Sequence, residues 1–261
     1  MICPFLFGKE GTMGDIIFII LAAGKGTRMK SDKAKVLHNL GGMPMIRYVV
    51  ATALAVADQV LVVIGHQAEA VRRALSDHPS VRFALQKEQL GTGHAVMSAI
   101  PLLAESARDA VILCGDTPLI KAQTIHALIK EHRAQGADLT IATTRLEYPF
   151  GYGRIISDDQ GGVLGIVEES DASALEKKIT TVNTGTYCVK IDFLKKFLPD
   201  LSDDNAQGEF YLTDVVGHAH RKGMAAATLE IDDTFEVLGI NTVEELAHAE
   251  RLVSEINRHR S

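Results

Sequence analysis

The sequence contains no tryptophan and only three cysteines, Cys3, Cys114 and Cys188, among its 261 residues. So few and widely spaced cysteines form neither a disulfide framework nor a zinc-binding motif. They are typical of a reducing compartment, so we expect a cytoplasmic location. The longest apolar run, residues 16–23, is far shorter than the roughly 18–20 residues that cross a bilayer. We therefore expect no membrane span.

Positive charge is also scarce, because 27 Lys and Arg face 33 Asp and Glu for a net charge of -6. Nucleic-acid backbones require concentrated positive charge, so general nucleic-acid binding is excluded, although a local basic pocket can still hold one phosphate ligand. Hydrophobic residues make up 46% and charged residues 23%, the balance of an ordinary globular protein.

The N-terminus lacks the features of a secretory signal. Apolar residues 3–7 have no basic residue before them, and a signal needs a positive flank and a longer apolar region. Because Met13 stands just before the first expected strand, we interpret residues 1–13 as a dispensable extension.

Short apolar runs alternate with helical patterns over the first two-thirds of the chain. We expect strands at 16–21, 60–64, 81–85, 110–114 and 139–144. Helices are expected at 46–57, 68–75, 93–103 and 122–135. This alternation predicts an α/β fold with a mostly parallel sheet flanked by helices. Such sheets bind ligands beyond the carboxyl ends of their strands, so the loops after strands are the candidate sites.

The pattern changes after residue 148, without a linker, a repeat or a low-complexity tract. We expect a hairpin of 151–156 with 162–167, a helix at 211–221, and strands at 182–189, 225–229 and 236–238. The last stretch, 242–260, reads as one helix, with Thr242 and Glu245 spaced as a capping box. We therefore assign one domain to 14–241 and a C-terminal helix to 242–261.

The strongest chemical signal follows the first expected strand. The segment comprises Leu21, Ala22, Ala23, Gly24, Lys25, Gly26, Thr27 and Arg28, with Lys35 a short distance on. Small residues let the backbone approach a ligand, and successive N–H groups can cradle phosphate oxygens. The segment fits neither a P-loop nor the dinucleotide fingerprint, since Ile19 and Met29 stand where each needs glycine. The alternative is a tight turn with solvated charges.

This segment resembles the Leu-x-x-Gly-x-Gly-Thr-x-Met…Lys signature of sugar-phosphate nucleotidyltransferases. Five further segments occur in the family's order: 86–95, 115–119, 151–155, 182–185 and 205–209. Together they resemble the uridyltransferase domains of the bacterial bifunctional enzymes that make UDP-N-acetylglucosamine. The resemblance runs from about residue 16 to 260 and implies a Rossmann-like nucleotide-diphospho-sugar transferase fold of the GT-A type.

The resemblance also implies roles for individual residues. Asp116 and Asn241 would hold Mg²⁺, whose preferred ligands are hard oxygens. The catalytic cations would be Arg28, Lys35 and, as a helper, Lys25. The substrate-binding residues would be Leu21, Ala22, Ala23, Gly24, Gly26, Thr27, Gln86, Gly91, Thr92, Gly115, Gly153, Glu168 and Asn183. Among these, Gln86, Gly91 and Thr92 would recognise uracil, whereas Gly153, Glu168 and Asn183 would line the N-acetylglucosamine site.

The expected reaction joins UTP and N-acetylglucosamine-1-phosphate into UDP-N-acetylglucosamine and pyrophosphate. Without the resemblance, Asp116 and Asn241 could be interpreted as turn or cap residues. Gln86 could be a solvated loop residue, and Cys114 a core residue. Three other functions stay open: a nucleotidyltransferase for another nucleotide and sugar phosphate, a non-catalytic nucleotide-sugar sensor, and a protein that docks through its last helix. A substrate panel separates the expected reaction from the first of these alternatives.

The sequence departs from the family pattern in two places. Ala34 stands before Lys35 where the family usually has proline, so we expect altered order in this loop. Full-length members continue into hexapeptide repeats that form an acetyltransferase β-helix and a trimer, whereas this sequence ends at Ser261. We therefore expect no acetyltransferase function and a monomer or weak oligomer, from either a single-function protein or a fragment.

Overall fold

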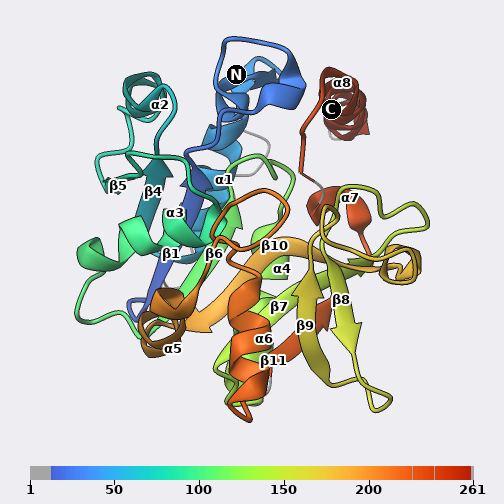
Figure 1. The fold of residues 1–261 in the computed structure, drawn as a ribbon. Coiled ribbons are helices and arrows are strands. Elements are labelled where there is room, and N and C mark those ends of the chain that lie inside the picture. Colours follow the sequence, from blue (N-terminus) through green and yellow to red (C-terminus); the bar gives the residue numbers. More distant parts are fainter. Residues whose placement is uncertain (1–12, 225, 238, 260–261) are drawn as a thin grey trace.

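Within residues 13–224, 226–237 and 239–259, which the computed structural model describes, nine strands form one sheet (Figure 1). Its order is β11-β7-β10-β6-β1-β4-β5, and β8 joins β9 to β10. The strands are β1 Ile16–Ala22, β4 Gln59–Ile64, β5 Val81–Leu85, β6 Asp109–Cys114, β7 Leu139–Arg145, β8 Arg154–Ser157, β9 Val163–Val167, β10 Thr181–Lys190 and β11 Ala226–Glu230. A separate hairpin pairs β2 Asn39–Leu40 with β3 Met43–Pro44.

The centre of the sheet is parallel and buried on both faces. Strand β1 pairs in parallel with both β4 and β6. Side chains alternate across a strand, so Phe18 and Ile20 join the core on one face, and Ile17 and Ile19 join the core on the other. This two-sided burial explains the unbroken apolar run in the sequence.

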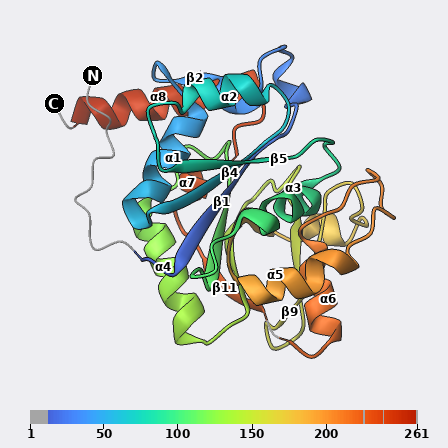
Figure 2. The same ribbon diagram turned by 90° about the vertical axis from the view of Figure 1, so that its left-hand side faces the viewer.

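Helices cover both faces of the sheet. The helices are α1 Met45–Val56, α2 Ala68–Ala74, α3 Thr92–Ala99, α4 Ala122–Ala134, α5 Ile191–Phe197, α6 Asp214–Arg221, α7 Thr234–Val237 and α8 Val243–His259. Helices α1 and α4 lie on one side of the sheet, whereas α3, α5 and α6 lie on the other (Figure 2). The α/β class and the largely parallel sheet predicted from the sequence are confirmed.

Strand β10 runs antiparallel to β6 and β7, and its register with β7 shifts between Asn183 and Tyr187. The shift contains Gly185 at φ +76°, a left-handed conformation that suits glycine. The irregular segment lies at the edge of the sheet where β6 ends, so it can line a site there.

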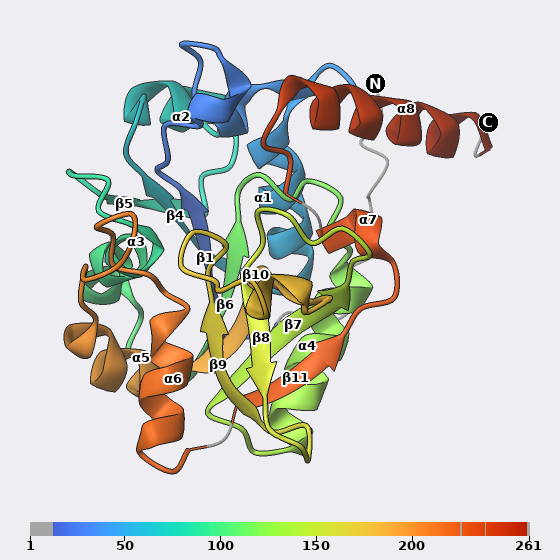
Figure 3. The ribbon, with the colours of Figure 1, turned by 45° about the vertical axis from the view of Figure 1, so that its right-hand side comes forward.

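The last described helix, α8, crosses above this edge of the sheet (Figure 3). Its Ala249 and Val253 pack in a small core with Leu40 and Tyr48. The predicted capping box is present: the Glu245 N–H donates to Thr242 Oγ1 at 3.1 Å, and the Thr242 N–H donates to Glu245 Oε2 at 3.0 Å. None of the described helices has the length and apolar character of a membrane span.

Some element predictions were wrong or fall outside the described residues. The strand predicted at 236–238 is wrong, because Thr234–Val237 forms helix α7, whose first turn is held by hydrogen bonds from Phe235 and Glu236 to Asp233. The predicted helix at 93–103 ends earlier as α3 and continues as a 3₁₀ turn over Ile100–Leu102. Outside the described part of the chain lie residues 1–12, 225, 238, 260 and 261. Most of the predicted N-terminal extension is therefore not described.

Candidate active site

Two cavities adjoin at the carboxyl ends of β1, β5 and β6. The first cavity, of about 470 Å³, is lined by predicted residues Leu21, Ala22, Ala23, Gly24, Lys25, Gly26, Thr27, Lys35, Gln86, Gly91, Thr92 and Asp116. The second cavity, of about 280 Å³, is lined by predicted residues Leu21, Arg28, Lys35, Thr92, Asp116, Gly153, Glu168, Asn183 and Asn241. Lys35 and Asp116 line both cavities, together with Leu21, Thr92 and Cys114, so the two cavities meet beside these residues.

Residues 23–35, named the β1 loop here, leave β1 through a tight turn. Gly26 has φ +65°, and a Cβ at this position would overlap the Cβ of Lys35. Only glycine fits such close packing in this conformation. The turn therefore brings Lys35 back against the start of the loop, beside the end of β6.

Four polar side chains converge where the cavities meet. Lys35 Nζ forms an ion pair with Asp116 and donates to Asn241 Oδ1 at 2.8 Å. Arg28 Nη2 donates to the same Asn241 oxygen at 2.9 Å. The Ile240 N–H donates to the Asp116 carbonyl at 2.9 Å, which joins the Asn241 segment to the end of β6. Residues far apart in sequence thus form one charged cluster.

The cluster has a donor set that a divalent cation could use. The Asp116 carboxylate and the Asn241 amide oxygen both contact one ammonium group, so two hard oxygens already surround a single cation. Within the described part of the chain, no three His, Cys, Asp or Glu side chains gather as a metal site. Any metal at this place would rely on these two oxygens together with oxygens of a ligand.

Gln86 and Gly91 form one wall of the first cavity. Gln86 is 3% exposed, and its Nε2 donates to the Gly91 carbonyl at 3.1 Å and lies 3.1 Å from His94 Nδ1. Gly91 has φ +103°, and a Cβ there would lie 2.6 Å from the Phe210 carbonyl oxygen. Thr92 Oγ1 accepts the Leu212 N–H at 3.0 Å. The wall is thus held by segment 210–212.

Glu168 stands in the second cavity beside Gly153, where a Cβ would lie 3.4 Å from Glu168 Oε2. Thr213 Oγ1 donates to Glu168 Oε1 at 2.9 Å. Burial raises the pKa of Glu168, although the Thr213 hydrogen bond opposes the shift. The neighbouring Glu169 instead pairs with buried Arg154 at 2.6 Å, which offsets burial and lowers the pKa of Glu169.

Asn183 also lines the second cavity, but its amide is engaged within β10. Its Nδ2 donates to the Tyr187 hydroxyl at 2.7 Å, and its Oδ1 accepts the Gly185 N–H at 3.0 Å. These bonds fix the register shift of the strand. Asn183 therefore shapes this wall of the second cavity through its contacts within β10, in addition to any contact it makes with a ligand.

Two predicted residues stand apart from the cluster. Lys25 lines the first cavity and is exposed. Gly115 lines neither cavity; its N–H donates to the Leu21 carbonyl at 2.9 Å, and a Cβ would lie 3.0 Å from that oxygen. Gly115 therefore lets β1 and the β6 end approach closely. The site roles of these two residues, like those of the other predicted residues, stay predictions.

Sequence reasoning missed several residues of the site, among them Cys114 and Tyr152. Cys114, interpreted as core, is half-buried and lines both cavities. Burial raises the pKa of its thiol to about 12, with the Asp116 charge adding to the shift. Tyr152 lines the second cavity, and burial raises its pKa to about 12. Tyr152 stands within a motif segment and Cys114 directly precedes one, but only the fold shows that they line the cavities.

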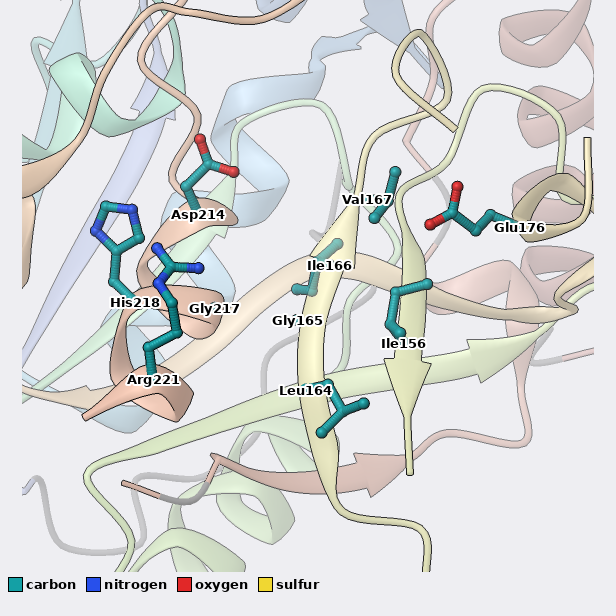
Figure 4. Close-up of a pocket in the computed structure, with 10 residues that line it drawn as sticks. All are labelled: Ile156, Leu164, Gly165, Ile166, Val167, Glu176, Asp214, Gly217, His218 and Arg221. Atoms are coloured by element: carbon teal, nitrogen blue, oxygen red, sulfur yellow. The ribbon is translucent and has the colours of Figure 1, made fainter. Parts of the chain in front are cut away.

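A further cavity, of about 310 Å³, lies between the β8–β9 hairpin and α6 (Figure 4). Asp214, His218 and Arg221 project from α6, and Glu176 lies on the far side of the hairpin (Figure 4). Burial raises the pKa of Asp214. This cavity contains none of the predicted site residues, and we assign it no part in the chemistry.

Comparisons with known proteins show which proteins this chain resembles. The family model of the MobA-like NTP transferase domain matches residues 18–178. The bifunctional protein GlmU of Geotalea uraniireducens is 47% identical over 242 residues, 92% of this chain and 53% of that protein. GlmU of Geobacter metallireducens is 48% identical over 94% of this chain and 52% of that protein. The chain thus spans about half the length of these relatives.

Two further matches extend the comparison. GlmU of Desulfotalea psychrophila is 47% identical, over 90% of this chain and 69% of that protein. The structure of a proposed glucose-1-phosphate thymidylyltransferase from Bacillus anthracis, in complex with sucrose, superposes with a TM-score of 0.71. It covers 91% of this chain and 94% of its own at 19% identity, which supports the fold. From these matches we conclude that the chain belongs to the MobA-like NTP transferase domain family, which confirms the nucleotidyltransferase resemblance that the motifs carried.

Proposed function

We propose that this chain transfers UMP from UTP to N-acetylglucosamine-1-phosphate, giving UDP-N-acetylglucosamine and pyrophosphate. The observation that carries the proposal is the pair of adjoining cavities with Lys35 and Asp116 at their junction. Such a junction suits a reaction in which two phosphorylated substrates must meet. The ordered motif segments and the GlmU relatives support the choice of substrates.

The first cavity is assigned to UTP. Both contacts of the Gln86 amide use Nε2, which leaves Oε1 as an acceptor that would suit the N3–H of uracil. The backbone of the β1 loop would hold the triphosphate near Lys25 and Lys35. Pyrophosphate would leave along this loop.

The second cavity is assigned to N-acetylglucosamine-1-phosphate. Glu168 offers a buried carboxyl group, and Gly153 keeps the wall beside it free of a side chain. An acetamido group and sugar hydroxyls require such neutral and acidic hydrogen-bonding partners. Arg28 at the edge of the cavity would receive the sugar phosphate.

Asp116 and Asn241 fit Mg²⁺, because their oxygens already share one cation and Mg²⁺ usually takes one or two protein ligands plus phosphate oxygens. When bound, Mg²⁺ would supply neutralisation of phosphate charge. Asn241 is held for this role by its own backbone, since its N–H donates to Glu245 Oε2 at 2.5 Å.

The chemistry requires positioning more than proton transfer. A sugar-phosphate oxygen, ionised near neutral pH, forms a bond to the α-phosphorus of UTP, and the bond from that phosphorus to the bridging oxygen of pyrophosphate breaks. No proton must be removed from the nucleophile. Arg28 and Lys35 would stabilise the charge on the five-coordinate phosphorus and on the leaving group.

Other assignments from the sequence accompany this proposal. We assign the activity to residues 14–241 and a supporting role to the following helix. The cytoplasmic location and the monomeric or weakly oligomeric state stay predictions. The free thiols of Cys114 and Cys188 agree with a reducing compartment.

The test is pyrophosphate release by the purified chain with Mg²⁺, UTP and N-acetylglucosamine-1-phosphate, beside CTP, dTTP and other sugar phosphates. We expect release to be fastest with the proposed pair. Faster release with another pair would overturn the substrate assignment. Binding of UDP-N-acetylglucosamine without release from any pair would favour a sensor.

A further inference from the structure

The turn between β4 and α2, residues 65–67, contacts both ends of the β1 loop. At one end, the His66 N–H donates to the Ala23 carbonyl at 3.0 Å. At the other end, Gln67 Oε1 accepts the Ala34 N–H at 3.0 Å, and Gln67 Nε2 donates to the Asp32 carbonyl at 2.5 Å. One short turn therefore ties the loop at its first residue and again just before Lys35.

The Gln67 side chain provides the hydrogen-bond partner that the buried Ala34 N–H needs. Ala34 is fully buried, so its N–H loses water on folding and needs a partner within the protein. The Ala34 carbonyl in turn accepts the Leu37 N–H at 2.9 Å and opens the 3₁₀ turn Lys35–Leu37. The position of Ala34 therefore fixes the start of this 3₁₀ turn, whose first residue is Lys35.

Gln67 makes these contacts from a strained backbone. Its φ is +52°, a left-handed conformation that is unfavourable for a residue with a Cβ. The conformation is held by the Ala68 N–H, which donates to Gly65, and by the Ala70 and Val71 N–H groups, which donate to Gln67. A glycine would relax the backbone here but would carry no amide to reach the β1 loop.

We propose that Gln67 is a positioning residue for Lys35: its amide clamps Asp32 and Ala34 and so fixes the catalytic end of the β1 loop. The expected effect of Gln67 on turnover rests on the proposed function. The clamp gives a structural basis for the altered order expected at Ala34, where the family usually has proline. The N–H that proline would lack is here the group that Gln67 holds.

The backbone conformation at Ala34 is also compatible with proline. Its φ of −53° and ψ of +135° fall in the range that proline adopts. Proline at this position would fix φ without any hydrogen bond. The clamp and a proline are thus alternative means of ordering the same segment, and each should make the other dispensable.

The test is a double-mutant cycle of Gln67→Gly and Ala34→Pro, with Glu69→Ala as a control on the exposed side of α2. Gln67→Gly should lower kcat/KM about tenfold, the effect of losing two hydrogen bonds. In the Ala34→Pro background the same change should cost less than about twofold. Thermal unfolding should move little with Gln67→Gly, because glycine relieves the positive φ while the amide contacts are lost.

A measurement without substrate separates this inference from the proposed function. Hydrogen exchange of the peptide spanning residues 30–37 should become faster in Gln67→Gly and not in Glu69→Ala. Unchanged exchange, or an equal loss of activity in both backgrounds, would overturn the clamp. Faster exchange in a chain that transfers no nucleotide would retain the clamp as a structural contact and overturn its catalytic role together with the proposed function.

Discussion

Replacement of Asn241 by alanine tests the charged cluster most sharply. The change removes the one oxygen that accepts both Arg28 Nη2, at 2.9 Å, and Lys35 Nζ, at 2.8 Å. Arg28 is exposed, so water can replace its lost contact and the free energy of unfolding should fall by less than about 1 kcal/mol. Loss of one contact made in the transition state costs turnover about a hundredfold or more. Asn241→Ala should therefore lower turnover strongly while changing the free energy of unfolding little.

The assay is pyrophosphate release with UTP and N-acetylglucosamine-1-phosphate, run beside urea unfolding of the same samples. Asn39→Ala, which removes an exposed amide on β2, provides the matched control. We expect Asn241→Ala to unfold almost like the unsubstituted chain while turning over about a hundredfold more slowly, equal to about 2.7 kcal/mol of activation free energy. A near-normal rate in a folded Asn241→Ala chain would refute the assignment of this amide to the reacting centre.

Three further outcomes follow from the site. Gly26→Ala should destabilise the chain by about 1–2 kcal/mol in urea unfolding, because φ is +65° and the new Cβ overlaps Lys35; an unchanged midpoint would contradict this. Burial raises the pKa of Glu168 above 4.5, so the folded chain binds the proton more tightly. The contribution of Glu168 to the free energy of unfolding should then fall as pH rises from 4.5 through the raised pKa, and Glu168→Gln should remove that contribution. EDTA should abolish turnover and Mg²⁺ restore it, whereas full activity in EDTA would count against Asp116 and Asn241 as ligands.

The sequence was sufficient where a local pattern determines the structure. The unbroken apolar run of β1 predicted a strand in a parallel sheet flanked by helices, and the Thr242 and Glu245 spacing predicted the cap of α8. The strand predicted at 236–238 failed because one turn of helix and a short strand share the same brief apolar pattern. Glu236, 5% exposed, is instead held by Thr124 Oγ1 at 2.7 Å, a contact that no local pattern shows.

The site itself depended on tertiary structure. Residue types alone left Asp116 and Asn241 as turn or cap residues, and only the resemblance paired them. The fold explains the pairing, since the Ile240 N–H binds the Asp116 carbonyl and both side chains reach Lys35. Gln67 gave no signal in the sequence, because its importance arises from a backbone conformation and from a loop more than thirty positions away.

The most direct test of the central claim is the phosphorus balance of the reaction, followed by ³¹P NMR as the purified chain acts on UTP and N-acetylglucosamine-1-phosphate with Mg²⁺. Transfer between the two cavities predicts UDP-N-acetylglucosamine and pyrophosphate in equal amounts, with no UMP. Pyrophosphate that appears together with UMP would show transfer to water, and unchanged spectra would show no transfer at all. Either result would contradict a site built to join two phosphorylated substrates.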